Sequence, residues 1–273
     1  LAGRIGDLVE SDPASAAALT EALRAARGLP AQGWLARISE EGAFVDAAAR
    51  DNPTEAFLRL AYRQVVGRAE RATDPYGIEA ETRPPIDGLV AAATRLDAAL
   101  AALAGPLEAL AAHLRARLDD DAETLDTDAR RRLEAIARGL QRRAAADLAG
   151  WRAALGALIA PAPRPEDDPF VDWLRVDRVE GRDRDVGLER RWLDPTAPLA
   201  ETLLRPAHGA LIASASLRDG GERDEADPEA SWIAAERRCG AQHLGGSPSR
   251  FAAASPFDYG EAARVLIIGD VRK

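Results

Sequence analysis

The sequence predicts a mainly α-helical chain, in which a helical bundle is followed by a smaller segment of mixed α/β character. Ala, Leu and Arg dominate residues 1 to about 160, where apolar positions recur with the spacing of α-helices. Short apolar runs, typical of strands buried in a parallel sheet, appear only in the last third of the chain. We therefore expect two domains, residues 1–162 and 163–273.

The first helices are expected at 13–27, 30–49 and 53–72. Asp12-Pro13 and Asn52-Pro53 mark two of their starts. Asp and Asn are favoured before a helix, and proline fits its first turn because that N–H needs no helical partner.

A leucine stripe begins at Leu96 and predicts a long helix with one buried face. Its spacing is 4-3-4-3-4-4, which keeps the side chains on one side of a helix. The members are Leu96, Leu100, Leu103, Leu107, Leu110, Leu114 and Leu118. Gly105-Pro106 interrupts this stripe, so we expect a kink or a short break there.

A second long helix is expected after the polar turn at 119–128. Its apolar positions are Leu133, Ile136, Leu140, Leu148, Trp151, Leu155 and Leu158. The short connection favours an antiparallel hairpin formed by this helix and the preceding one.

A proline-rich stretch at 160–168 reads as a linker into different architecture. Extended segments are expected beyond it, at 170–176, 185–192, 210–215 and 264–268. The last two, ALIASA and RVLII, are the apolar runs that suggest a parallel sheet.

Composition excludes several classes of function. The chain has 45 acidic and 36 basic residues, for a net charge of −9, so any contact with nucleic acid must be local. Lys273 is the only lysine, so a phosphate-binding Gly-Lys-Ser/Thr loop cannot be present. Cys239 is the only cysteine, and the three histidines are scattered, so we expect no metal site.

No apolar run reaches the roughly 18 to 20 residues of a membrane span, so we expect a soluble, cytoplasmic protein.

The chain has no methionine, and we therefore expect it to be a fragment of a longer parent protein. It contains HGALIASASLRDGG at 208–221 and ASPFDY at 254–259. This order resembles the DinG/XPD family of ATP-dependent DNA helicases, in which a strand ending in Ser-Ala-Thr-Leu forms motif III and SPFDY leads toward the second motor domain. FVDWLRV at 170–176 and VGLERRWLDPTAPL at 186–199 resemble the strands that return from the helical arch of these proteins.

The resemblance implies an arch followed by part of a P-loop NTPase motor. Motif III would be Ser214, Ala215, Ser216 and Leu217, with Ser216 where the family has threonine. Its hydroxyl groups would couple ATP hydrolysis to DNA movement. The parent would bind Mg-ATP outside this chain and would move 5′ to 3′ on single-stranded or forked DNA. An iron–sulfur cluster, which relatives hold with cysteines upstream of the arch, is compatible with this resemblance. The chain alone would hold no catalytic residue, and we expect a monomer.

Arginines supply the candidate DNA contacts. Arg131, Arg138 and Arg142 share one face of the second long helix, and residues 128–152 hold seven arginines against three acids. Arginine neutralises phosphates, although such a face is also common on solvated helices.

The sequence DEAD at 224–227 follows motif III, whereas a working magnesium-binding box precedes it, so we interpret it as a polar loop.

The alternative function is a non-enzymatic scaffold that binds a partner protein through the leucine stripes.

Overall fold

The computed structural model describes residues 6, 9, 12–39, 52–69, 74–164, 167–218, 228–253 and 256–266, except the side chain of Tyr259. The described residues are mostly helical, as predicted, and include a small antiparallel sheet. The chain divides into two compact units, residues 1–193 and 194–273.

Two of the N-terminal helices begin where the sequence predicts, at Pro13 and Pro53, whereas the helix expected from residue 30 begins at Trp34. The N-terminal helices are α2 (Pro13–Ala25), the 3-10 turn η1 (Ala26–Gly28), α3 (Trp34–Ser39) and α5 (Pro53–Arg68). The Asp12 side chain accepts hydrogen bonds from the first backbone N–H groups of α2, and Asn52 does the same for α5. The predicted ends of two helices, at 40–49 and 70–72, lie outside the described residues.

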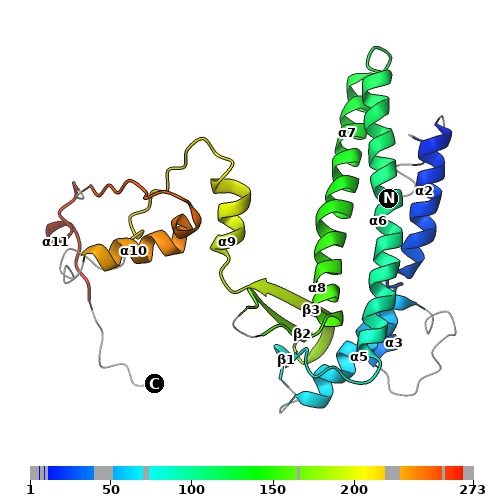
Figure 1. The fold of residues 1–273 in the computed structure, drawn as a ribbon, viewed down its shortest axis with the longest axis horizontal. Helices are drawn as coiled ribbons and strands as arrows, with labels where there is room; N and C mark the ends of the chain where they lie inside the picture. The colour runs from blue at the N-terminus through cyan, green and yellow to red at the C-terminus, as the bar shows by residue number, and fades with distance from the viewer. Residues whose placement is uncertain are drawn as a thin grey trace. The chain divides into compact units, whose positions relative to one another are not determined.

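The predicted helical hairpin is confirmed. Helix α6 (Leu89–Asp120) turns back through α7 (Thr127–Arg142), the π-helical segment η2 (Arg143–Leu148) and α8 (Ala149–Ile159). Helices α7 and α2 both pack along α6 (Figure 1). Five leucines of the predicted stripe are buried: Leu96, Leu100, Leu103, Leu110 and Leu114.

Of the kink or short break expected at Gly105-Pro106, the break does not occur. Helix α6 is continuous from Leu89 to Asp120 with Pro106 inside it. Leu103 and Leu110 are buried on either side of the proline, so packing on both flanks offsets the backbone hydrogen bond that proline cannot donate.

Helix α6 is also the one helix in the described part of the chain that is long and apolar enough to cross a membrane. Central helices of soluble proteins share that property. Because α6 is packed by α2, α5, α7 and α8, we assign it to the core of a soluble protein.

A three-stranded antiparallel sheet closes the base of the hairpin. Its order is β1 (Gly77–Glu81), β2 (Phe170–Val179) and β3 (Arg182–Trp192). Strands β2 and β3 match the predicted extended segments, whereas β1 has no counterpart in the prediction. Glu180 and Gly181 join β2 to β3 with positive φ angles of 53° and 74°, as a two-residue hairpin turn with left-handed residues requires.

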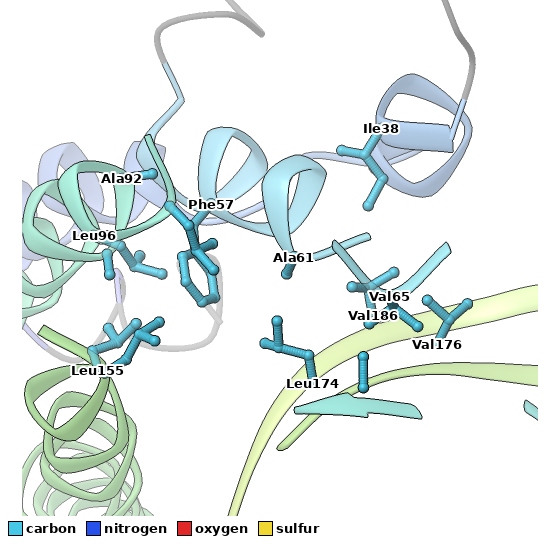
Figure 2. Packing of buried hydrophobic residues seen from close by; sticks show 14 of the residues in the cluster. Ile38, Phe57, Ala61, Val65, Ala92, Leu96, Leu155, Leu174, Val176 and Val186 are labelled. Carbon is cyan, nitrogen blue, oxygen red and sulfur yellow. The ribbon is translucent and has the colours of Figure 1, made fainter. Parts of the chain in front are cut away.

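The core of the first unit joins the sheet to the helices. Figure 2 shows Phe57 of α5 beside Leu96 of α6 and Leu155 of α8. Leu174, Val176 and Val186 extend this cluster across the sheet. The domain boundary predicted at 162/163 therefore lies earlier than the boundary at 193/194, because β2 and β3 pack with the helices that precede them.

The second unit is small. It comprises α9 (Thr196–Leu199), the π-helical segment η3 (Ala200–Leu204), α10 (Pro228–Cys239), the 3-10 turn η4 (Ala241–His243) and α11 (Tyr259–Ala262). Ala200 and Ala235 are its buried apolar side chains in the described part of the chain.

The prediction of strands in this second unit was wrong for the described residues. Residues 210–215 and 264–266 lie outside any strand, and Leu211 and Val265 are 94% and 87% exposed. An apolar run becomes a buried strand only beside other strands, and the described part of this unit supplies none. Residues 267–268, the DEAD segment at 224–227 and residues 254–255 of ASPFDY lie outside the described residues.

Candidate nucleic-acid interface

The candidate interface is the exposed side of α7, which carries the predicted arginines. Asp126 caps the helix by accepting the N–H of Ala129 at 2.8 Å. Leu133, Ala137 and Leu140 form the buried side and pack with leucines of α6. Since an amphipathic helix directs its opposite side to solvent, the arginines are held outward by the burial of these residues.

Arg131, Arg138 and Arg142 are all exposed, as predicted from their spacing. Among the described residues none of the three forms an ion pair. Arg138 donates only a long hydrogen bond, 3.4 Å, to the backbone oxygen of Glu134. Their guanidinium groups therefore present donors that an external phosphate can use.

Neighbouring arginines differ in this respect. Arg130 donates to the Ala122 carbonyl at 2.9 Å, and Arg143 donates to the Gly139 carbonyl at 3.3 Å. Arg152 of α8 pairs with Asp97 of α6 at 2.8 Å, and the pKa of Arg152 is raised by that hydrogen bond. Arg130 and Arg152 therefore join different segments of the hairpin, whereas Arg143 bonds only within its own helix, as Arg138 does. The exposed Arg132 lies beside the predicted set.

Trp151 is a surface residue that the sequence pattern misplaced. The prediction put it on the apolar side of its helix, but it is 54% exposed, whereas Leu148, Leu155 and Leu158 are buried. The π-helical segment η2 does not explain this, because it ends before Trp151, and Leu155 and Leu158 follow Trp151 in the same α-helix at spacings that share one side.

The predicted motif III residues lie in the second unit and begin a turn. The backbone N–H of Ser216 donates to Ser214 Oγ at 3.2 Å, and the N–H of Leu217 points to the Ser214 carbonyl at 3.4 Å. Ser214, Ala215 and Ser216 are exposed, and the Leu217 carbonyl accepts from Arg238 at 2.8 Å. This local arrangement is a hydroxyl-stabilised turn.

The second unit also holds a polar cluster around Asp194. The carboxylate accepts from the Thr196 hydroxyl at 2.6 Å and contacts His243 Nε2 at 2.9 Å. Hydrogen bonds from Thr196 lower the pKa of Asp194. The Thr196 hydroxyl lies 3.2 Å from the same Nε2 atom. A nucleophile relay needs the hydroxyl and the carboxylate on opposite ring nitrogens, so this cluster is a structural clamp between α9 and η4.

The described residues contain no group of three His, Cys, Asp or Glu side chains placed to hold a metal ion. An open depression of about 510 Å³ lies at the start of α7, lined by residues that include Asp126, Asp128 and Arg132. Its two carboxylates make it a poor anion site.

The chain was compared with protein-family models, with curated proteins and with solved structures, and none of these comparisons gives a match.

Proposed function

We propose that this chain is part of an ATP-dependent DNA helicase of the DinG/XPD type. It would contribute the arch and motif III, while Mg-ATP, and an iron–sulfur cluster if the parent has one, would bind outside this chain. The observation that carries the proposal is the exposed set Arg131, Arg138 and Arg142, free of acidic partners on a chain of net charge −9. The parent would act in the cytoplasm as a monomer on single-stranded or forked DNA.

A second observation supports the motor part of the proposal. The segments at 210–215 and 264–266 are apolar yet uncovered, with Leu211 94% and Leu266 86% exposed. Apolar segments of this length are covered in a stable protein, either by another part of the chain or by a partner. In the family that the sequence resembles, such segments are strands of the motor sheet, and further strands of that sheet would cover them.

The alternative, a scaffold that binds a partner through its leucine stripes, has less support. That function requires the stripes to be available. The leucines of α6 are instead buried against other helices of the same unit.

The arginine surface is tested by changing Arg131, Arg138 and Arg142 together to glutamine. DNA affinity is measured by fluorescence anisotropy with single-stranded oligonucleotides over a range of salt concentrations. Loss of three phosphate contacts should weaken binding and reduce the slope of log K against log salt by about 2, since each contact on a single strand contributes about 0.7.

The matched control changes Arg24, Arg164 and Arg205 to glutamine. These arginines are exposed and already paired with Glu21, Asp167 and Glu201. The control removes the same total charge as the test variant. Because its arginines are already paired with carboxylates, it should leave the salt slope nearly unchanged. Equal effects of the two triple variants would show that binding is non-specific attraction and would remove the proposed interface.

Motif III is tested in the parent protein through its DNA-stimulated ATPase activity. Replacing Ser214 and Ser216 with alanine should reduce the stimulation by DNA and leave DNA affinity unchanged. Unaltered stimulation would contradict the coupling role.

A further inference from the structure

We infer that the proposed nucleic-acid interface spans both long helices of the hairpin, with Arg115 of α6 binding a phosphate beside the arginines of α7. This inference rests on the proposed function and deepens it. It adds a cation that the periodicity of α7 cannot reveal, because Arg115 belongs to the other helix.

Arg115 lies at the edge of the contact between the two helices. It follows Leu114, which is 0% exposed, and its partner Gln141 follows Leu140, which is 2% exposed. The two leucines belong to one buried cluster between α6 and α7, which lie side by side (Figure 1). Arg115 and Gln141 are both exposed, and the Arg115 guanidinium donates a hydrogen bond to Gln141 Oε1. The guanidinium group therefore lies against α7.

Gln141 places this contact next to the predicted arginines. It follows Arg138 by three residues in the uninterrupted α-helix α7, and residues at that spacing are neighbours on a helix surface. Their directions differ by about 60° around the helix axis, and their positions by about 4.5 Å along it. Arg138 and Arg142 are four residues apart and share one side. Arg115 thus lies at the margin of the exposed side of α7 that carries the candidate phosphate contacts.

The hydrogen-bond partner of Arg115 leaves its charge uncompensated. Gln141 is a neutral amide, whereas Arg152 of α8 pairs with the carboxylate of Asp97 at 2.8 Å. Among the described residues Arg115 forms no ion pair. Asp119 stands four residues later on α6, and arginine before acid is the less favourable order at this spacing. One N–H group serves Gln141, so the remaining donors of the guanidinium can bind a phosphate.

The phosphate backbone of a nucleic-acid strand is the ligand that fits this arrangement. Phosphates repeat along the strand, so cations on two adjacent helices can bind different phosphates of one strand. A strand that contacts both Arg138 and Arg115 must cross from α7 to α6. Because each arginine that binds a phosphate displaces counterions, the contribution of Arg115 is visible in the salt dependence of binding.

The experiment compares Arg115→Gln, Arg115→Lys and Arg95→Gln in the 273-residue chain. Binding of single-stranded oligothymidine is measured by fluorescence anisotropy at several salt concentrations. Arg115→Gln should weaken binding about two- to fivefold, the effect of one exposed charge pair. It should also reduce the slope of log K against log salt by about 0.7, the contribution of one phosphate on a single strand.

Arg115→Lys keeps the positive charge and should keep the slope of the unaltered chain. Arg95→Gln is the matched control, because Arg95 is exposed on the same helix and forms no ion pair among the described residues. It precedes Arg115 by 20 residues, about 30 Å along α6, and should change neither the affinity nor the slope.

Normal binding by Arg115→Gln, with the α7 triple variant impaired, would overturn the inference and leave the proposed function standing on α7 alone. Equal losses in Arg115→Gln and Arg95→Gln would also overturn it, since the effect would then follow net charge and not position. An unaltered chain that does not bind oligothymidine would remove the proposed interface and the inference together.

Discussion

Glu55 is a buried acid at which the N-terminal helices converge. Its side chain is 1% exposed and accepts hydrogen bonds from the Ala31 N–H at 3.2 Å and from Arg37 Nε at 3.0 Å. A second bond from Arg37 measures 2.5 Å. The carboxylate thus fixes the loop before α3 to the first turn of α5.

Replacing Glu55 with glutamine should destabilise the first unit by about 1–3 kcal/mol, because charge-assisted hydrogen bonds are lost in a buried place. Urea unfolding at neutral pH measures the change. Glu108→Gln, an exposed substitution on α6, is the control and should stay within about 0.5 kcal/mol of the unaltered chain.

The same residue predicts a pH dependence. The hydrogen bond from Arg37 lowers the pKa of Glu55 below its ordinary value of 4.5. A group whose pKa is lower in the folded state contributes stability above its unfolded pKa and loses it as the pH falls toward the folded pKa. Stability should therefore decline below about pH 4.5, and less steeply in Glu55→Gln. Equal slopes for the two proteins would exclude Glu55 as the source.

Gln64 is a second residue with a clear structural role. Its buried amide donates to the carbonyls of Glu81 and Thr82 at 2.8 and 3.0 Å, and its oxygen accepts the Ile86 N–H at 2.9 Å. Gln64→Leu should cost about 2–3 kcal/mol, since buried backbone groups lose their partners. Thermal unfolding can be compared with Gln32→Leu, an exposed position, where a similar loss would disprove the specific role of the buried amide.

Pro106 lies inside α6 without ending it. A proline in a helix interior costs about 3 kcal/mol relative to alanine, because it cannot donate the backbone hydrogen bond. Pro106→Ala should therefore raise the free energy of unfolding by about 1–3 kcal/mol. Pro53→Ala, at the first turn of α5 where proline fits, should give little gain. A larger gain at Pro53 than at Pro106 would contradict this account.

Helical periodicity predicted the elements whose partners lie nearby in the chain. The stripe from Leu96 to Leu114 and the positions Leu133 and Leu140 describe a hairpin that is local in sequence, so the pattern alone was sufficient. Strand β1 was missed because GIEAE has no strong strand pattern, and it is fixed by pairing with β2, nearly the whole hairpin away. The opposite error occurred at 210–215, where an apolar pattern has no adjacent strand among the described residues.

The candidate site was predictable to a similar extent. Exposure of Arg131, Arg138 and Arg142 followed from the positions of the leucines opposite them. The exposure of Trp151 did not, because Trp151 stands three residues after the buried Leu148 and four before the buried Leu155, a spacing that predicts burial.

Buried apolar side chains are unevenly distributed between the two units. Both buried clusters lie within residues 1–193, whereas the described part of 194–273 buries Ala200 and Ala235. Burial of apolar surface is the main source of folding stability. The two units should therefore differ greatly in their ability to fold alone.

Residues 1–193 made alone should unfold in one cooperative thermal transition, as measured by far-UV circular dichroism. Residues 194–273 made alone should show none. A cooperative transition in the smaller piece would mean that it has a core of its own and needs no further strands.

Strand β1 precedes α6 and β2 follows α8, and the two strands are direct neighbours in the sheet. The sheet therefore fixes the hairpin at the end where α6 begins and α8 ends, while the connection at 121–126 is not fixed by any strand. Helical turns could be added to or removed from α6 and α7 together at that connection without changing the strand pairing. The length of the hairpin can thus vary independently of its attachment to the three strands.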